Sequence, residues 1–418
     1  MKRTPPHKGT GRHSHRHHEE KGMEGMIENL TRRQFVGAGA IAAGLGLAGC
    51  SSSSSKDSSS SSSTSASGSG ALRGSSADEY DADLVKAAKE EGSLVVYGCC
   101  EEPYISAACD KYTEIFGIQT SWQRLSTGEV LAKIEEENGS PSADIWFAGT
   151  TDPYNVASTE NLLETYKATN ASHIMSDKYT STDNTWVGIY KGILGFLTNT
   201  EDLDDKKLDA PADWPDLLDS GYKGLIWSSN YNTSGTAKLI LNTCVQKYGH
   251  DDGIKYLVDL DKNIAQYTKA GGGPSKSIGT GECTIGIGML HDGIYQIVDN
   301  GYDNIGLVVP SSGASYEVGA TAVIKGAAHP NAAKLWLEYC LTPTCVNQAA
   351  GTGSYQFLVI DDAKQPDVAE EFGLDPNNVM DYDFEDAKQN TTQYVDDLMA
   401  ALEAAGENTS DTTRFQTS

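Results

Sequence analysis

The chain has 418 residues, 38% of them hydrophobic, and a formal net charge of −26 at pH 7. This acidic balance argues against nucleic acid and against a polybasic membrane contact, because both need clustered lysine and arginine. The part that we expect to fold, from about residue 78 to the end, exceeds one ordinary core, so we expect two domains.

A secretory signal is expected near the start of the chain. The pair Arg32 and Arg33 precedes a short Gly/Ala/Leu segment, which ends in Leu-Ala-Gly directly before Cys50. The arginine pair is typical of a twin-arginine signal. A cysteine after Leu-Ala-Gly is the lipobox pattern, in which the thiol takes a diacylglycerol. The apolar segment is too short to span a bilayer. We therefore expect residues 1–49 to be an N-terminal extension and signal peptide, and Cys50 to be lipidated.

The segments on either side of this signal are not expected to pack into a core. Residues 1–25 hold histidines at positions 7, 13, 15, 17 and 18. For this segment we favour a translation start at Met23 or Met26 over a metal site. Residues 50–80 are mostly serine and form a flexible tether. The sequence thus predicts an extracytoplasmic protein anchored by lipid to the cell membrane.

Seven cysteines remain once Cys50 is lipidated, and an odd number leaves at least one free thiol. None of them has the spacing of a zinc site, so no metal ligands are predicted. We expect small buried residues with one or two disulfides, whose pairing stays open.

The folded part begins with alternating helices and strands. A helix at 81–91 has apolar residues at helical spacing and ends at Gly92. Further along, the predicted strands are 93–98, 117–122 and 143–147, and the predicted helices begin at Pro103 and Ser126. This alternation predicts a parallel sheet, whose ligand loops lie at the carboxyl ends of its strands.

The same pattern continues in the second half of the chain. A long crossing strand is expected at 187–198, and a capped helix start at 213–218. The other expected strands are 225–227, 284–289, 305–309 and 318–325, with helices at 233–241 and 332–340. The fold class is therefore α/β.

Three loops place hydroxyl or glycine residues at a helix N-terminus that follows a strand. They are 126–128, 233–236 and 271–275. Free N–H groups and the positive end of the helix dipole bind phosphate or carboxylate there without a lysine. An ordinary helix cap is the alternative for each loop. The candidate anion ligands are Ser126, Thr127, Ser234, Gly235, Thr236 and Ser275.

A second group of polar residues follows other strands. His291 and Asp292 come after the strand at 284–289, and Glu317 precedes the strand at 318–325. A neutral imidazole and two carboxylates suit sugar hydroxyls, which both donate and accept hydrogen bonds. The same trio could bind a metal, act in acid–base catalysis, or form a surface ion pair. No hydrolase or nucleotide-binding signature occurs, so no enzyme activity is predicted.

A family likeness rests on several of these motifs. The chain from about 90 to 360 resembles the periplasmic-binding-type solute receptors of ABC importers, in the iron(III)- or phosphonate-type branch. The stretch 316–327, from Tyr316 to Ala327, is the most specific piece, and with Ser354-Tyr355-Gln356 it looks most like the hexose-phosphate-binding members. The other pieces are 94–97, 128–134, 143–146, 233–236 and 281–282.

The resemblance implies a two-lobed type II fold with the ligand in the cleft. Lobe 1 would combine 81–188 with 318–358, and lobe 2 would combine 189–317 with 359–418. Binding would close the lobes by a hinge motion that the permease subunits of the importer read. The protein would be a monomer and would need no cofactor.

The resemblance also bears on the ligand. Ferric members bind iron through a histidine, a glutamate and two adjacent tyrosines, and Glu101, Gly149 and His291-Asp292 stand in those places here. Sugar-phosphate members match at His291, Asp292 and Glu317, whereas Glu101 is a possible ligand contact that could clash with a phosphate. The expected ligand is a small phosphorylated organic anion, a sugar phosphate. The alternatives are a receptor for ferric iron, another metal complex or a phosphonate, a secreted phosphatase-like hydrolase, and a surface adhesin.

Overall fold

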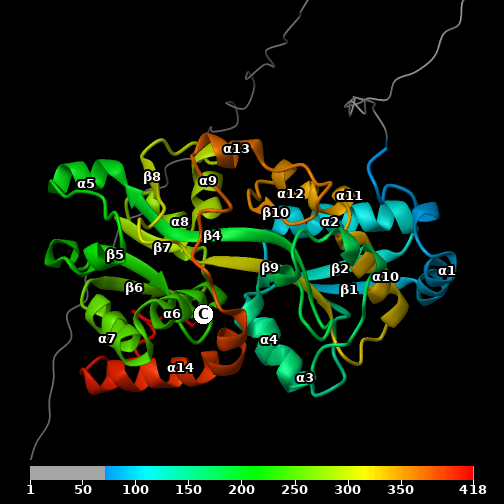
Figure 1. Ribbon diagram of the computed structural model, residues 1–418, viewed down its shortest axis with the longest axis horizontal. Coiled ribbons are helices and arrows are strands. Elements are labelled where there is room, and N and C mark those ends of the chain that lie inside the picture. Colours follow the sequence, from blue (N-terminus) through cyan, green and yellow to red (C-terminus); the bar gives the residue numbers. More distant parts are fainter. Residues whose placement is uncertain (1–70, 418) are drawn as a thin grey trace, which may run out of the picture. The chain divides into compact units, whose positions relative to one another are not determined.

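The computed structural model describes residues 71–417 (Figure 1). The predicted signal at 1–49, the lipidation site Cys50 and the serine-rich tether up to residue 70 lie outside the described residues. Within the described part, no helix is both long enough and apolar enough to cross a membrane.

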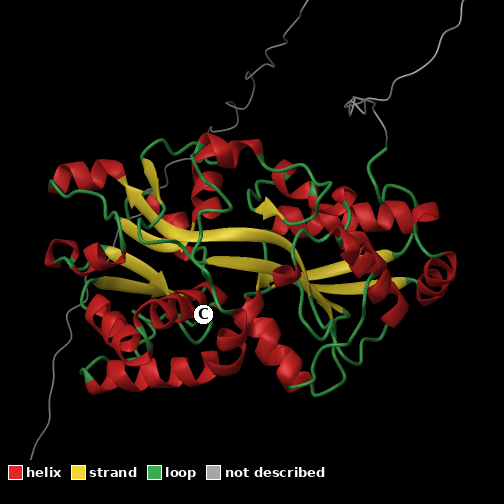
Figure 2. Cartoon of the chain, viewed as in Figure 1, coloured by secondary structure: helices red, strands yellow, loops and turns green. Residues whose placement is uncertain are grey.

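A ten-stranded sheet organises the described part, in the order β2-β1-β3-β9-β4-β7-β5-β6, with β8 and β10 paired to β4. Parallel strands form both outer parts of this order, and antiparallel pairings join them through β9 and β4 (Figure 2). The strands are β1 (Ser93–Gly98), β2 (Gln119–Arg124), β3 (Ile145–Thr150), β4 (Val187–Asn199), β5 (Ile226–Ser229), β6 (Ile264–Thr268), β7 (Ile285–Met289), β8 (Ile305–Val308), β9 (Tyr316–Val323) and β10 (Phe357–Leu358).

The chain therefore has a two-lobed α/β fold. We call the lobe that holds β1, β2 and β3 the first lobe, and the lobe that holds β5, β6 and β7 the second lobe. Strand β4 belongs to both: residues 187–193 pair with β9, and residues 194–198 pair with β7. All of its residues are buried, as expected for a strand covered on both faces.

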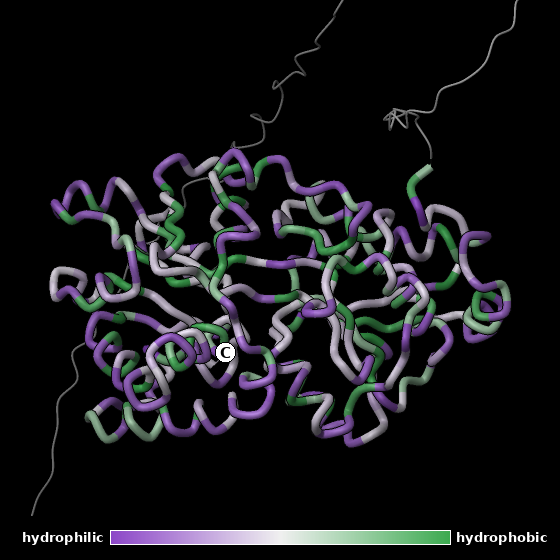
Figure 3. Tube along the Cα trace, viewed as in Figure 1, coloured by the Kyte–Doolittle hydropathy of each residue, from purple (hydrophilic) through white to green (hydrophobic). Residues whose placement is uncertain are grey.

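Helices pack above and below the sheet in the view of Figure 1. They are α1 (Ala82–Glu91), α2 (Glu102–Phe116), α3 (Thr127–Glu137), α4 (Thr151–Thr159), α5 (Thr200–Lys206), α6 (Gly235–Tyr248), α7 (His250–Asp261), α8 (Gly273–Ile278), α9 (Leu290–Val298), α10 (Pro330–Cys340), α11 (Pro343–Val346), α12 (Gln348–Gly351), α13 (Asp367–Glu371) and α14 (Phe384–Ala404). Hydrophilic residues predominate on the peripheral loops and helices (Figure 3).

One hydrophobic core cluster lies within the first lobe, and another contains buried residues of both lobes. In the first lobe, aromatic rings join α2 to α10: the ring centroids of Tyr112 and Trp336 are 5.3 Å apart, and those of Tyr112 and Tyr339 are 5.6 Å apart. All three side chains are fully buried. Packing of this kind fixes α2 against α10. The loops at the carboxyl ends of the strands in the first lobe are therefore attached to rigid elements.

The observed elements differ from the expected ones in a few places. Strand β2 begins at Gln119, two residues later than expected, and the expected helix start at 213–218 is a 3-10 helix, Trp214–Leu218. Strand β9 begins at Tyr316, so Glu317 lies inside the strand. The expectation of one or two disulfides is wrong for the described part, where all seven cysteines are free.

Candidate functional site

A cavity of about 80 Å³ lies where the loops of the two lobes meet. All of the predicted site residues except Ser275 line it. The full lining is Cys99, Cys100, Glu101, Arg124, Ser126, Thr127, Gly149, Thr150, Tyr190, Ser234, Gly235, Thr236, Ala270, Gly271, Gly272, Met289, His291, Asp292, Glu317 and Gln356.

A smaller cavity of about 10 Å³ shares four lining residues with the first and is lined by Ser275. The two cavities share Glu101, His291, Asp292 and Gln356. The Ser275 hydroxyl donates a hydrogen bond to the carbonyl oxygen of Gly272 at 2.9 Å. This hydrogen bond stabilises the loop to which Ser275 belongs. Helix α8, which carries Ser275, has six residues and is too short to offer an anion site of its own.

One end of the main cavity is built from the N-termini of two long helices. Ser126 caps α3 and Ser234 caps α6, and each hydroxyl accepts a hydrogen bond from a backbone N–H in the first turn of its helix. The other first-turn N–H groups have no partner within their helix and carry the positive end of its dipole. Because both helix ends face one cavity, this end suits an anion with several oxygens.

The two lobes touch beside these helix ends. The Ser126 hydroxyl donates to the carbonyl oxygen of Thr233 at 3.2 Å, and Lys269 forms an ion pair with Glu129 at 2.7 Å. Glycine is needed for this approach at Gly128, where a Cβ atom would lie 2.7 Å from the same carbonyl oxygen. The described conformation is therefore one in which the lobes are closed on each other.

Acidic and imidazole groups form the other end of the cavity. His291 and Asp292 lie in the first turn of α9, and the His291 Nε2 atom is 3.6 Å from Asp292 Oδ1 and 4.0 Å from Glu317 Oε1. Gly192 makes room for the group, since a Cβ there would lie 2.7 Å from the imidazole. The buried Nδ1 atom of His291 has no hydrogen-bond partner among the described residues. This end therefore has unused capacity to donate and accept hydrogen bonds.

Burial shifts the protonation of these three groups toward their neutral forms. It lowers the pKa of His291 to about 3 and raises the pKa of Asp292 to about 7, with Glu101 adding to the second shift. Burial also raises the pKa of Glu317 to about 8, and the charge of Asp292 adds to that shift. At neutral pH the imidazole is neutral, and the two carboxyl groups are near their titration midpoints.

We expect the ligand-free protein to lose stability as the pH rises from about 4 to about 8. Over this range the folded protein keeps protons on Asp292 and Glu317 that the unfolded chain releases, so these two groups lower the free energy of unfolding as the pH rises. His291 opposes this up to pH 6.5, the usual pKa of histidine, because the unfolded chain holds a proton there that the folded protein does not, so the fall should be steepest above that pH. Urea midpoints measured at pH 5 and pH 8 would check this, and Glu317→Gln should flatten the dependence. An equal dependence in that variant would contradict our assignment of the pKa shift.

Arg124 is a cavity residue that the sequence did not lead us to predict. It ends β2, two residues before the cap Ser126, and lines the cavity. Its guanidinium makes no ion pair and no hydrogen bond within the described part of the chain. An unpaired arginine beside two helix N-termini is well placed to meet an oxyanion bidentately. Its position at the carboxyl end of a predicted strand was the signal that could have identified it.

The ligands of a ferric site are not assembled in this cavity. Glu101 and Gly149 line it as expected, but the tyrosine there, Tyr190, stands alone on β4. Its hydroxyl accepts a hydrogen bond from the N–H of Gly149 at 3.0 Å, and burial raises its pKa far above the usual value. Tyrosinate coordination of iron is therefore disfavoured at this position.

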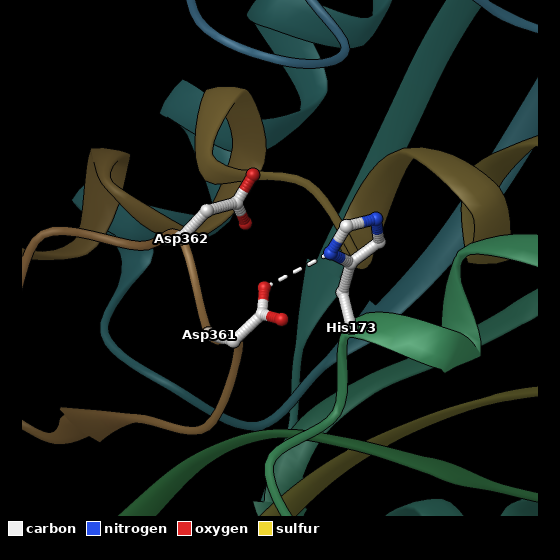
Figure 4. A group of neighbouring side chains, drawn as sticks. All are labelled: His173, Asp361 and Asp362. Atoms are coloured by element: carbon white, nitrogen blue, oxygen red, sulfur yellow. Dashed lines mark hydrogen bonds and ion pairs between the residues drawn. The ribbon is translucent and has the colours of Figure 1, made fainter. Parts of the chain in front are cut away.

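Elsewhere in residues 71–417, one group of side chains has ligand atoms close enough for a metal ion: His173, Asp361 and Asp362 (Figure 4). The Nδ1 atom of His173 lies 2.9 Å from Asp361 Oδ1. Both oxygens of Asp362 accept hydrogen bonds from Arg73 at 2.7 Å. Since the arginine neutralises this carboxylate, the group is a surface ion-pair cluster and not an open metal site.

The cavity lacks the arrangement of a hydrolase that uses His291. Catalysis by an activated hydroxyl or thiol needs a base in hydrogen-bond contact with the nucleophile. His291 lies near carboxylates only, and among the described residues it makes no hydrogen bond to a hydroxyl or thiol.

Comparison with known proteins gives matches over most of the folded part. The profile of the bacterial extracellular solute-binding proteins matches residues 141–390. An uncharacterised protein of Haemophilus influenzae is 36% identical over 310 residues, which cover 72% of this chain and 87% of that protein. A putative 2-aminoethylphosphonate-binding periplasmic protein of Salmonella typhimurium is 25% identical over 193 residues, 46% of this chain and 54% of that protein.

Solved structures show the same architecture. The periplasmic binding protein AfuA of Actinobacillus pleuropneumoniae, with exogenous fructose-6-phosphate bound, has a TM-score of 0.70 and 32% identity and covers 75% of this chain and 99% of its own. Iron-bound HitA of Pseudomonas aeruginosa has a TM-score of 0.64 and 18% identity, over 73% of this chain and 99% of its own. At that identity, the second likeness concerns the fold alone.

Proposed function

Given that the chain belongs to the family of bacterial extracellular solute-binding proteins, we propose that it captures a sugar phosphate and delivers it to an ABC permease. The family places it in the class of periplasmic solute-binding proteins of ABC transporters. Such proteins bind a small solute outside the cytoplasmic membrane. The proposal concerns the ligand, the residues that hold it and the way in which the protein is anchored.

The observation that carries the proposal is the polarity of the main cavity. The N-termini of α3 and α6 make up one part of the lining and the buried trio His291, Asp292 and Glu317 another, and the unpaired Arg124 lines the same cavity within electrostatic reach of Asp292. A phosphate at the helix N-termini would take N–H, hydroxyl and guanidinium donors from Ser126, Thr127, Ser234, Gly235 and Thr236, together with Arg124. Sugar hydroxyls would meet the trio. Ser275 and Glu101 would border the hydroxyl end from the smaller cavity.

Two relatives support a ligand of this kind. AfuA, 32% identical, binds fructose-6-phosphate in its structure. The Salmonella typhimurium relative is named for an aminoalkyl phosphonate. Both compounds combine a tetrahedral phosphorus oxyanion with a small polar organic group. A phosphonate is therefore the second candidate ligand, and ferric iron the third.

The proposal includes the anchor, the lobes and their motion. Residues 1–49 direct export by the twin-arginine route, Cys50 carries the lipid, and residues 51–70 tether a monomeric receptor to the membrane. This tether is shorter than the expected linker 50–80, because residues 71–80 pack on the folded part, where Arg73 pairs with Asp362. Lobe 1 comprises 81–188 with 318–358, and lobe 2 comprises 189–317 with 359–418. The lobes open about the crossing strands β4 and β9 and close on the ligand.

A thermal-shift and calorimetric screen tests the ligand class. At a hundred times its dissociation constant, a ligand adds about 2.7 kcal/mol to the free energy of unfolding. We expect hexose phosphates to stabilise the protein and unphosphorylated hexoses to leave it unchanged. A visible tyrosinate band on adding Fe(III), or release of inorganic phosphate at enzymatic rates, would overturn the proposal in favour of the ferric or the hydrolase alternative.

Ser234→Ala should weaken every phosphorylated ligand about tenfold. A hydrogen bond to a charged group contributes about 1.5–3 kcal/mol, and the buried Ser234 hydroxyl faces the anion end. Because Ser234 also caps α6, the ligand-free stability should fall by about 1 kcal/mol. Calorimetric titration with several phosphates measures the first effect. A loss limited to one sugar would contradict this role.

A further inference from the structure

A third carboxylate, Glu101, stands beside the buried trio of the cavity. It lines both the main cavity and the smaller one, as Asp292 and His291 do. It sits at the N-cap position of α2 but makes no capping hydrogen bond, so its carboxylate is not used by its own helix. Its charge adds to the raised pKa of Asp292, which places the two groups within electrostatic reach of each other.

The positive charges near these carboxyl groups are Lys276 and Arg124, both of which lower the pKa of Asp292 against the effect of burial. Lys276 lies 3.7 Å from Glu101, and its side chain is more than half exposed. Within residues 71–417, Asp292 and Glu317 have no lysine or arginine within 4.0 Å, and their one close partner is the neutral His291. The Glu317 side chain is 6% exposed, so water screens it poorly.

The cavity thus joins a strong anion site to an excess of carboxylates. A ligand with a phosphoryl anion and only hydroxyl groups would keep Asp292 and Glu317 in the protonated forms that burial favours and would bring no cation to Glu101. A ligand with a positively charged group at its far end would instead pair with these carboxylates through charge-assisted hydrogen bonds. The polarity of the cavity matches a molecule that is negative at one end and positive at the other.

We infer that the ligand carries a protonated amine opposite its phosphoryl group, as in a phosphorylated amino sugar, with Glu101, Asp292 and Glu317 facing the ammonium. The inference rests on the proposed function, since it assigns the second half of the same ligand. It makes Glu101 a specificity-determining residue. Without Glu101, the trio alone would suit a neutral sugar.

The inference predicts the direction of proton exchange on binding. The titratable groups near Asp292 and Glu317 are His291, Glu101, Asp152, Tyr190, Lys276 and Arg124, of which only the last two are cations. A bound ammonium lowers the pKa of both carboxyl groups, so protons leave at pH 7.5. A bound phosphate dianion without an amine raises them, so protons are taken up.

Glucosamine 6-phosphate and glucose 6-phosphate test the inference, because they differ at one position by an amine in place of a hydroxyl. Calorimetry at pH 7.5 in two buffers of different ionisation enthalpy gives both the affinity and the proton count. We expect glucosamine 6-phosphate to bind at least tenfold more tightly and to release protons. Equal or tighter binding of glucose 6-phosphate would overturn this inference alone. Failure of both compounds to bind would overturn the proposed function as well.

The variant Glu101→Gln separates specificity from general binding. It should remove most of the preference for the amine, about tenfold, while leaving the affinity for glucose 6-phosphate unchanged or improved. Glu102→Gln is the matched control, because Glu102 is the exposed neighbour and lines neither cavity. An equal preference in wild type and in Glu101→Gln would overturn the assignment of Glu101.

Discussion

Replacing Gly128 with alanine should weaken ligand binding about 100-fold without destabilising the ligand-free protein. Gly128 lies in the first turn of α3, and a Cβ atom there would sit 2.7 Å from the carbonyl oxygen of Thr233 in the other lobe. Overpacking of this kind costs up to about 3 kcal/mol, which is about two orders of magnitude in affinity. The clash exists only when the lobes are closed, so the open state escapes it. Alanine is also the better helix former, and the ligand-free protein should be as stable as before or more so.

Calorimetric titration and thermal unfolding of the same variant check both parts of this expectation. Gly351→Ala is the matched control, because a Cβ at Gly351 would meet no atom within 4 Å. Unchanged affinity in Gly128→Ala would mean that the ligand-bound lobes do not come as close as they are described here. A fall in ligand-free stability would show that the clash is present without ligand.

Replacing Arg124 with methionine should lower the affinity for every phosphorylated ligand by about 10- to 100-fold. The guanidinium lines the cavity without a partner in the described chain, so its donors are free for an oxyanion. A hydrogen bond to a charged group contributes about 1.5–3 kcal/mol. The affinity of the variant should also depend less on salt concentration, because the attraction between the guanidinium and the phosphate, which salt screens, has been removed.

A charge control is needed for this variant, because the chain is strongly acidic. Lys86→Met changes the net charge by the same amount at an exposed position on α1, away from the cavity. It should leave the affinity unchanged. If both variants lost affinity equally, the effect of Arg124 would come from the overall field of the protein and not from contact with the anion.

Local patterns in the sequence were enough to predict most of the elements that carry the site. The predicted strand 93–98 coincides with β1, and the capping residues Ser126 and Ser234 begin α3 and α6 as expected. These features depend on short-range physics: apolar runs, hydroxyl caps and glycine ends. The loops at the strand ends then follow from the parallel arrangement.

Other elements were missed because their signals are weak or long-range. The buried stripe of α14, at 387, 391, 395, 398 and 402, has helical spacing but includes alanine and threonine, so it does not stand out among the charges. Helix α14 gains its stability from packing on α4, α6 and α7, which no local pattern encodes.

The site itself divides in the same way. The hydroxyl, glycine, histidine and carboxylate residues of the site were predicted from the sequence. Arg124 was not predicted, because it precedes the predicted anion loop 126–128 by two residues. The contact of Gly128 with Thr233 joins residues far apart in the chain, so only the packed lobes reveal it. The placement of Glu317 inside β9 likewise depends on where the strand begins to pair with β4.

Strand β4 has a practical consequence for anyone who wishes to engineer this receptor. One half of the strand completes the sheet of the first lobe, and the other half completes that of the second. A cut within 187–199 would divide this strand and would also separate β9 from β3, its neighbour in the sheet, so each half-protein would be expected to aggregate when produced alone. A fluorescent reporter of closure is therefore better inserted into an exposed surface turn, where the backbone forms no shared ladder.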